Sequence, residues 1–178
     1  MDKFSLPART LHWSIALLLL FQIPLAWYMT DLPLGPAKFE NYALHKSIGM
    51  LLFALAVLRL VRAVLGTRPP LPAGTPLWEK ILAKATQGLL YLLVILMPIS
   101  GWLLSSAANV PVVVFGVLKL PMLTEPNKEF AAGMASAHEI QGWILMTLVL
   151  LHIGAGLKHQ FVNKDDVLHS MLPWVKKR

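Results

Sequence analysis

Four apolar stretches, each long enough to cross a lipid bilayer, constrain this chain more than any other feature. They cover about residues 11–29, 44–65, 87–107 and 140–157. About 20 apolar residues of helix span the hydrocarbon layer, and a helix satisfies every backbone amide where no water is present. None of the stretches alternates apolar and polar residues as a membrane strand does. The sequence therefore predicts an all-α fold, an integral membrane bundle of four antiparallel helices.

The composition agrees with a membrane protein made of one domain. Hydrophobic residues make up 56% of the 178 residues and charged residues only 14%, which is more apolar surface than a soluble domain buries. No repeat or low-complexity segment divides the chain, so we expect residues 1–178 to form a single domain. The first stretch follows Lys3 and Arg9 as a secretion signal would, but it is long and lacks a clear cleavage site. We interpret it as a retained span.

Lysine and arginine residues predict the orientation, because they favour the cytoplasmic side of a membrane. Of the 16 such residues, twelve lie on the side of the termini: Lys3, Arg9, Arg59, Arg62, Arg68, Lys80, Lys84, Lys158, Lys164, Lys176, Lys177 and Arg178. The other side holds Lys38, Lys46, Lys119 and Lys128. We therefore expect both termini in the cytoplasm. The basic segments suit anionic lipid, and nothing in their pattern indicates a nucleic-acid-binding module.

The connections between the stretches differ in character. Residues 30–43 contain prolines and Gly35, which predicts a short turn region. The second connection begins rich in proline, and we expect helix again near Trp78. Residues 108–137 are apolar although they lie outside the hydrocarbon layer. We expect them on the membrane surface or over the mouth of the bundle.

Histidines are the candidate cofactor ligands. The chain has no cysteine, which excludes thiolate metal sites, cysteine-ligated clusters and covalently attached haem. His138 and His152 lie 14 residues apart, which is about 21 Å along one face of a helix. No single metal ion reaches both, so a compact zinc or di-iron cluster is excluded and each histidine needs a partner from another helix.

The predicted topology supplies these partners. His12 begins the first span and lies on the inner side, whereas His45 begins the second span and lies on the outer side. The fourth span places His138 outside and His152 inside, so depth pairs His12 with His152 and His45 with His138. Two imidazoles that face each other are the arrangement that six-coordinate haem iron requires. Such an iron transfers electrons rather than binding dioxygen. A single histidine at a span end is more often an interfacial hydrogen-bonding group, which is our interpretation of His169.

Small residues follow each paired histidine after one helical turn: Ala16, Gly49, Gly142 and Gly156. A flat cofactor laid against a helix needs such gaps. Small residues also let helices approach one another in lipid, so the pattern is compatible with both interpretations.

At these blocks the sequence resembles a known family. The segments "LHWSIALLLL", "ALHKSIG", "RPPLP", "AHEIQGWILMTLVLLHIGAGLKH" and "NKDDVLHSMLP" occur in order along almost the whole chain. They are similar to the bacterial cytochrome b-561 family of small diheme proteins, which includes superoxide oxidase. The resemblance implies two non-covalent b haems in a four-helix bundle of the inner membrane. Its ligands fall on His12, His45, His138 and His152.

The resemblance also implies an activity, superoxide:ubiquinone oxidoreductase. Superoxide would be oxidised on the outer side, and ubiquinone would be reduced near the cytoplasmic side, beside His159, Trp13 and Ser14. His159 is equally compatible with an interfacial role. The chain departs from some members of the family by carrying Lys84 and Gln87 where they carry histidines, so a proton or quinone role of those histidines stays open. The alternative function is an electron-relay cytochrome b subunit that serves a partner dehydrogenase.

Charged residues near the two histidine levels have two interpretations each. Arg59 lies 14 residues after His45, at the depth of the inner pair, where its guanidinium suits a haem propionate. The alternative for Arg59, and our interpretation of Arg62, is a side chain that reaches the lipid headgroups.

The outer mouth contains three candidate cations for attracting superoxide. They are Lys46, Lys119 and Lys128. Positive charge at a site raises the capture rate of a small anion, but each lysine is equally compatible with ordinary loop charge.

Overall fold

Four long helices form the frame of the molecule in the computed structural model, which describes residues 3–66, 69–72 and 74–172. They are α1 (Leu6–Asp31), α2 (Pro36–Leu65), α3 (Leu77–Ala107) and α4 (Lys128–Lys158). All four are long and apolar enough to cross a membrane, so the predicted all-α membrane bundle is confirmed. Four of the basic residues used for the orientation lie outside the described residues: Arg68, Lys176, Lys177 and Arg178.

Each helix extends beyond the apolar stretch that predicted it. α2 begins at Pro36, inside the expected turn region, because proline is well tolerated in the first turn of a helix. α4 begins at Lys128, so residues 128–137 are helical and do not belong to the irregular connection that was expected. The Asn127 side chain caps this helix by accepting a hydrogen bond from the Phe130 amide at 2.9 Å. Hydropathy locates the hydrocarbon layer, whereas the cap decides where the helix begins.

The rest of that connection forms a small hairpin over the bundle. β1 (Val113–Val114) pairs antiparallel with β2 (Leu118–Lys119), and the first two residues of the three-residue turn, Phe115 and Gly116, have positive φ. The Phe115 amide donates a hydrogen bond of 2.9 Å to Ser47 Oγ on α2. The hairpin is therefore fastened to the helix that carries His45, two residues away.

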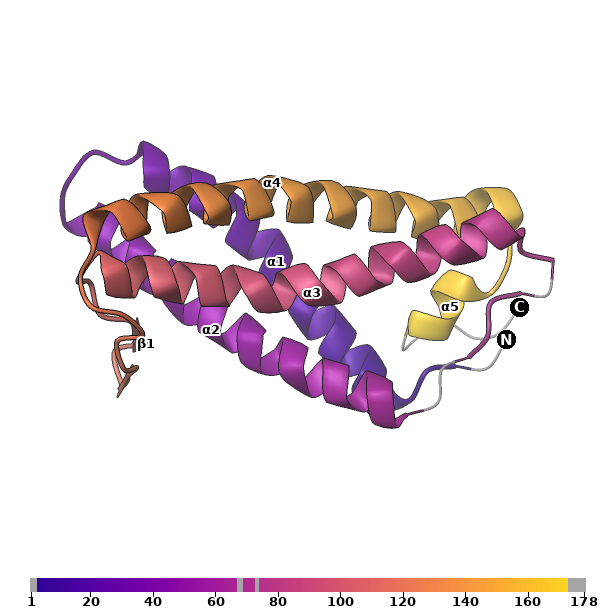
Figure 1. Cartoon of the computed structure of the whole chain (residues 1–178). Coiled ribbons are helices and arrows are strands. Elements are labelled where there is room, and N and C mark those ends of the chain that lie inside the picture. The colour runs from indigo at the N-terminus through magenta and orange to yellow at the C-terminus, as the bar shows by residue number, and fades with distance from the viewer. Residues whose placement is uncertain (1–2, 67–68, 73, 173–178) are drawn as a thin grey trace.

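The helices pack in chain order, α1 against α2, α2 against α3 and α3 against α4. Figure 1 shows the hairpin at one end of the bundle and the beginning of α1 at the other. Neither α1 with α4 nor α2 with α4 is among the closely packed helix pairs. The two histidine pairs predicted from depth are those that join α4 to α1 and to α2.

The chain folds back under the bundle after α4. A π-helical turn, η1 (His159–Asn163), leads to the short helix α5 (Val167–Met171), which lies beside the end of the bundle where α1 begins (Figure 1). The carbonyl of Ser170 accepts a hydrogen bond from the Phe4 amide at 3.2 Å. His169 and Ser170 are buried by this contact. The C-terminal segment therefore closes the end of the bundle at which α1 begins.

Ser47→Ala tests the attachment of the hairpin. The substitution removes the oxygen that accepts the Phe115 amide proton, and an unsatisfied polar group costs about 1–3 kcal/mol. We expect the Phe115 amide to exchange its hydrogen about tenfold faster or more, measured by hydrogen exchange of the purified protein.

Ser105→Ala is the matched control. Ser105 is also buried, and its hydroxyl makes no hydrogen bond within the described residues. We expect it to leave the exchange of Phe115 unchanged. Equal exchange rates in wild type and Ser47→Ala would contradict the proposed attachment.

Candidate functional site

The inner histidine pair joins the first turns of α1 to the last turns of α4. The ring centroids of His12 and His152 lie 6.0 Å apart, with 76° between the ring planes. Trp13 lies against His12 at 5.3 Å between ring centroids. Two imidazoles from separate helices therefore face each other at this level.

The outer pair joins α2 to the beginning of α4. The ring centroids of His45 and His138 lie 6.3 Å apart, with 77° between the planes. α4 thus contributes one imidazole to each pair, and the helical rise between its two histidines is about 21 Å. The structure brings together both pairs that depth predicted.

The separations fit one metal centre between each pair. Imidazoles bound to opposite sides of one metal ion have ring centres about 6 Å apart, given metal–nitrogen bonds of about 2 Å and the size of the ring. Nδ1 of His45 is buried and has no hydrogen-bond partner within the described residues, so no described side chain competes with a metal ion for this ring. No group of three or more His, Cys, Asp or Glu side chains gathers elsewhere in the described chain. The geometry suits bis-imidazole haem ligation, which stays a prediction for these four residues.

The small residues after the histidines lie against neighbouring side chains. A Cβ atom on Gly49 would meet Gln22 Nε2 at 3.7 Å, and one on Gly142 would meet Met97 Cε at 3.7 Å. Both distances are ordinary van der Waals contacts, so an alanine would fit at either position, and the pattern stays compatible with close helix approach and with a gap for a cofactor.

A different glycine lies closest to a candidate ligand. A Cβ atom on Gly101 would lie 3.1 Å from Cε1 of His138, so a side chain there would press on the imidazole. Sequence reasoning missed Gly101 because the third span carries no histidine, and only the packing of α3 on α4 reveals it.

Arg59 lies at the inner level, where the sequence predicted it. Its Nη1 donates a hydrogen bond of 2.9 Å to the Ala8 carbonyl, one turn before His12, and its guanidinium lies 5.7 Å from the centre of the Tyr91 ring. Arg62 donates to Ser5 Oγ at 3.1 Å. Both arginines therefore fasten α2 to the beginning of α1, and a propionate contact of Arg59 stays a prediction.

The residues predicted at the quinone end meet through the C-terminal segment. Trp13 Nε1 donates to the Met171 carbonyl at 3.0 Å. His159 Nδ1 lies 2.6 Å from Asp165 Oδ2, and Asp165 Oδ1 accepts from the Val167 amide at 3.0 Å. The Asp165 carboxylate therefore orients the His159 ring and also binds the first backbone amide of α5.

Two further polar residues belong to this end. Ser14 is half-buried, and its hydroxyl forms no hydrogen bond in the part of the chain that the structure describes. The hydrogen bond between His169 and Asp166, 3.3 Å from Nδ1 to Oδ1, lowers the pKa of the Asp166 carboxyl. Sequence reasoning did not single out Asp165 or Asp166, since the pairing of Asp165 depends on the turn after α4.

The outer lysines have different surroundings. Lys46 is half-buried beside His45 and forms no hydrogen bond or ion pair within the described residues. Lys119 lies on the exposed strand β2. The ammonium group of Lys38 caps the end of α1, because it donates hydrogen bonds to the Thr30 and Leu32 carbonyls at 2.9 and 2.8 Å.

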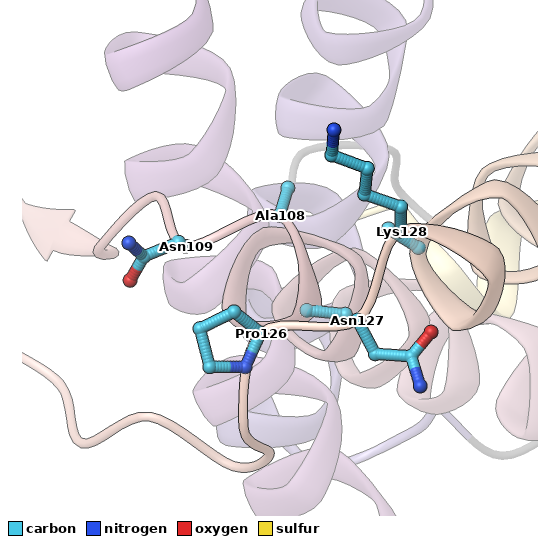
Figure 2. A pocket seen from close by; sticks show the side chains of 7 residues that line it. Ala108, Asn109, Pro126, Asn127 and Lys128 are labelled. Carbon is cyan, nitrogen blue, oxygen red and sulfur yellow. The ribbon is translucent and has the colours of Figure 1, made fainter.

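Lys128 lines a hollow of about 450 Å³ where α3 ends and α4 begins. Figure 2 shows the Lys128 and Asn109 side chains pointing away from each other there. The Asn127 backbone amide donates to the Ala107 carbonyl at 2.9 Å. The polar groups of the hollow thus fasten the connection and do not converge on a common point.

Lys84 and Gln87 are exposed on α3. Within the described residues neither forms a hydrogen bond or ion pair with the paired histidines, and α3 contains no histidine, so it contributes no candidate haem ligand.

Comparisons with known proteins identify the family of this chain. Residues 3–174 match the family model described as prokaryotic cytochrome b561. The chain is 31% identical over 173 residues to cytochrome b561 homolog 2 of Escherichia coli (strain K12), which covers 96% of this chain and 92% of that protein.

Two further relatives cover most of both chains. The probable superoxide oxidase CybB of Yersinia pestis is 28% identical over 182 residues, covering 99% of this chain and 98% of that protein. Cytochrome b562 of Cereibacter sphaeroides is 31% identical over 170 residues, covering 92% of this chain and 90% of that protein. This chain therefore belongs to the prokaryotic cytochrome b561 family, whose members bind b-type haem, and is a multi-pass cytochrome of the bacterial inner membrane with a role in electron transfer.

Proposed function

We propose that this protein is a superoxide:ubiquinone oxidoreductase with two b haems. The observation that carries the proposal is the pair of facing imidazoles at each of two levels of the bundle, both completed by α4. When bound, the haems supply reversible one-electron transfer. In the overall reaction two superoxide anions lose one electron each, and one ubiquinone takes up two electrons and two protons.

The chain's own residues would keep the two haem sites apart and prevent dioxygen from binding at the iron. His138 and His152 lie on one continuous helix, which keeps the inner and outer centres about 21 Å apart along its axis. If each pair holds one haem, both of its imidazoles would bind the iron, and iron with two such ligands transfers electrons rather than binding dioxygen. These features favour passage of electrons over chemistry at the metal.

Substrate capture is proposed at the outer end. Lys46 is the outer lysine whose charge lies beside a paired histidine and is not neutralised by another described residue. A cation there raises the local concentration of a small anion. Both termini are proposed to lie in the cytoplasm, which puts His45 and His138 on the extracytoplasmic side.

Quinone reduction is proposed at the inner end, next to Trp13, Ser14 and His159. Asp165 Oδ2 lies 2.6 Å from Nδ1 of His159 and orients the ring, which leaves Nε2 as the nitrogen that can exchange a proton with the quinone. Nε2 of His159 then donates a proton to the reduced quinone. The contacts of the C-terminal segment with α1 support residues 1–178 as one domain.

A relay function for a partner dehydrogenase is the second candidate. The tip of the hairpin is apolar and exposed, with Phe115, Val117 and Leu118 at 54%, 88% and 59% of their full exposure. Exposed apolar groups of this kind mark surfaces that contact another protein or lipid. A relay would pass electrons from the partner without superoxide chemistry.

Alanine substitutions test the ligand assignment. We expect His12→Ala and His152→Ala to remove one haem, and His45→Ala and His138→Ala to remove the other, because each iron needs both imidazoles. Haem per chain, quantified with the optical spectrum of purified protein, checks this. His159→Ala is the control and should keep both haems. Full haem content in a substituted pair would contradict the ligand assignment.

Superoxide decay tests the proposed reaction against the relay. Purified protein with a soluble ubiquinone should shorten the lifetime of superoxide from xanthine oxidase and form one quinol per two superoxide anions. Lys46→Gln should slow haem reduction by superoxide several-fold at low salt, and Lys119→Gln less, because Lys46 is adjacent to His45 whereas Lys119 lies on the exposed strand β2. An unchanged superoxide lifetime, with haem reduction only after addition of a co-purified dehydrogenase, would favour the relay.

A further inference from the structure

Ser100 is buried where α3 meets the outer histidine pair. Its side chain is 6% exposed, and its Oγ lies 3.0 Å from Nδ1 of His138. The same Oγ lies 2.9 Å from the Met97 carbonyl and 3.0 Å from Gln141 Oε1. Three polar neighbours from two helices therefore converge on one hydroxyl.

The proton count of this cluster indicates the direction of each hydrogen bond. A serine hydroxyl has a single proton, and both Met97 O and Gln141 Oε1 are acceptors. Serine within a helix commonly donates to a carbonyl of the preceding turn, which Met97 supplies here. With its proton given to an oxygen, Oγ can only accept from His138. Nδ1 of His138 therefore carries the proton, and Nε2 keeps the lone pair that binds a metal.

The packing around Ser100 holds the ring as well. The next residue, Gly101, brings the α3 backbone so close that a Cβ atom would lie 3.1 Å from His138 Cε1. Gln141 follows His138 by one turn of α4. The imidazole is thus held by a hydrogen bond at Nδ1 and by the bare backbone of α3 beside Cε1.

No other paired histidine has such a partner. Within the described residues, the rings of His12, His45 and His152 form no side-chain hydrogen bond. An acceptor at Nδ1 makes the opposite ring nitrogen a stronger donor to a metal, which stabilises the oxidised state of the iron.

We propose that Ser100 is a positioning residue that fixes the tautomer of His138 and lowers the reduction potential of the outer haem. This inference rests on the proposed function, since it takes His138 to be a ligand of that haem. It predicts that the two centres differ in potential partly because one of the four ligands has a hydroxyl partner.

The test compares Ser100→Ala and Ser100→Val with Ser100→Thr in the haem-loaded protein. Potentiometric titration with optical detection, and electron paramagnetic resonance of the oxidised protein, report on each haem. Ser100→Ala and Ser100→Val should raise the midpoint potential of the outer component and change its resonance signature, with the inner component unchanged. Ser100→Thr keeps the hydroxyl and should restore both readouts. Ser105→Ala is the control for removing a buried hydroxyl from α3, and it should resemble wild type.

The outcomes separate this inference from the proposed function. Wild-type potential and resonance signature in Ser100→Ala would overturn the role of Ser100, as would an equal shift in Ser105→Ala. If Ser100→Ala loses the outer haem, retention by Ser100→Thr supports the role of the hydroxyl, and loss in both variants overturns it. Full haem content in His138→Ala would instead overturn the ligand assignment on which the inference rests.

Discussion

A polar group inside a lipid bilayer has no water to bind, so it must find a partner within the protein or in a cofactor. Three buried polar side chains of the spanning helices meet this constraint close to the histidines. Gln22 Nε2 donates to the His45 carbonyl at 2.8 Å, Ser47 donates to the Ala43 carbonyl at 2.8 Å, and Ser100 contacts His138. Polar side chains that are costly in hydrocarbon are thus placed where they order the candidate ligands.

The two ends of the bundle are organised by different means. At the outer end, hydroxyl and amide groups within the helices contact the histidine-bearing turns, and the hairpin is fastened over them through Ser47. At the inner end, the helices are held by groups beyond the hydrocarbon layer. The ion pair between Lys158 and Glu79, 2.7 Å long, joins α4 to α3, and the C-terminal segment is bonded to α1 through Trp13. An electron path between two such ends has chemically distinct entrance and exit surroundings.

Much of this arrangement was predictable from the sequence because membrane insertion simplifies folding. Hydropathy defines the spans, and a chain that crosses the membrane repeatedly must alternate direction. Residue position alone therefore placed His12 with His152 and His45 with His138. The prediction of helix ends and contacts was weaker outside the apolar spans, where hydropathy gives no signal. The beginning of α4 at Lys128, for example, depends on the Asn127 cap.

The sequence by itself determined the membrane class, the four helices and the depth of each histidine, because these follow from the length of apolar runs and from helical rise. Only the tertiary structure decided which groups touch the imidazoles. Ser100 and Gly101 come from α3, a helix without candidate ligands, and Asp165 reaches His159 only because the chain turns back after α4. Such contacts depend on the rotation and spacing of neighbouring helices. Side-chain packing sets both, and the hydropathy and residue spacing of one sequence do not predict them.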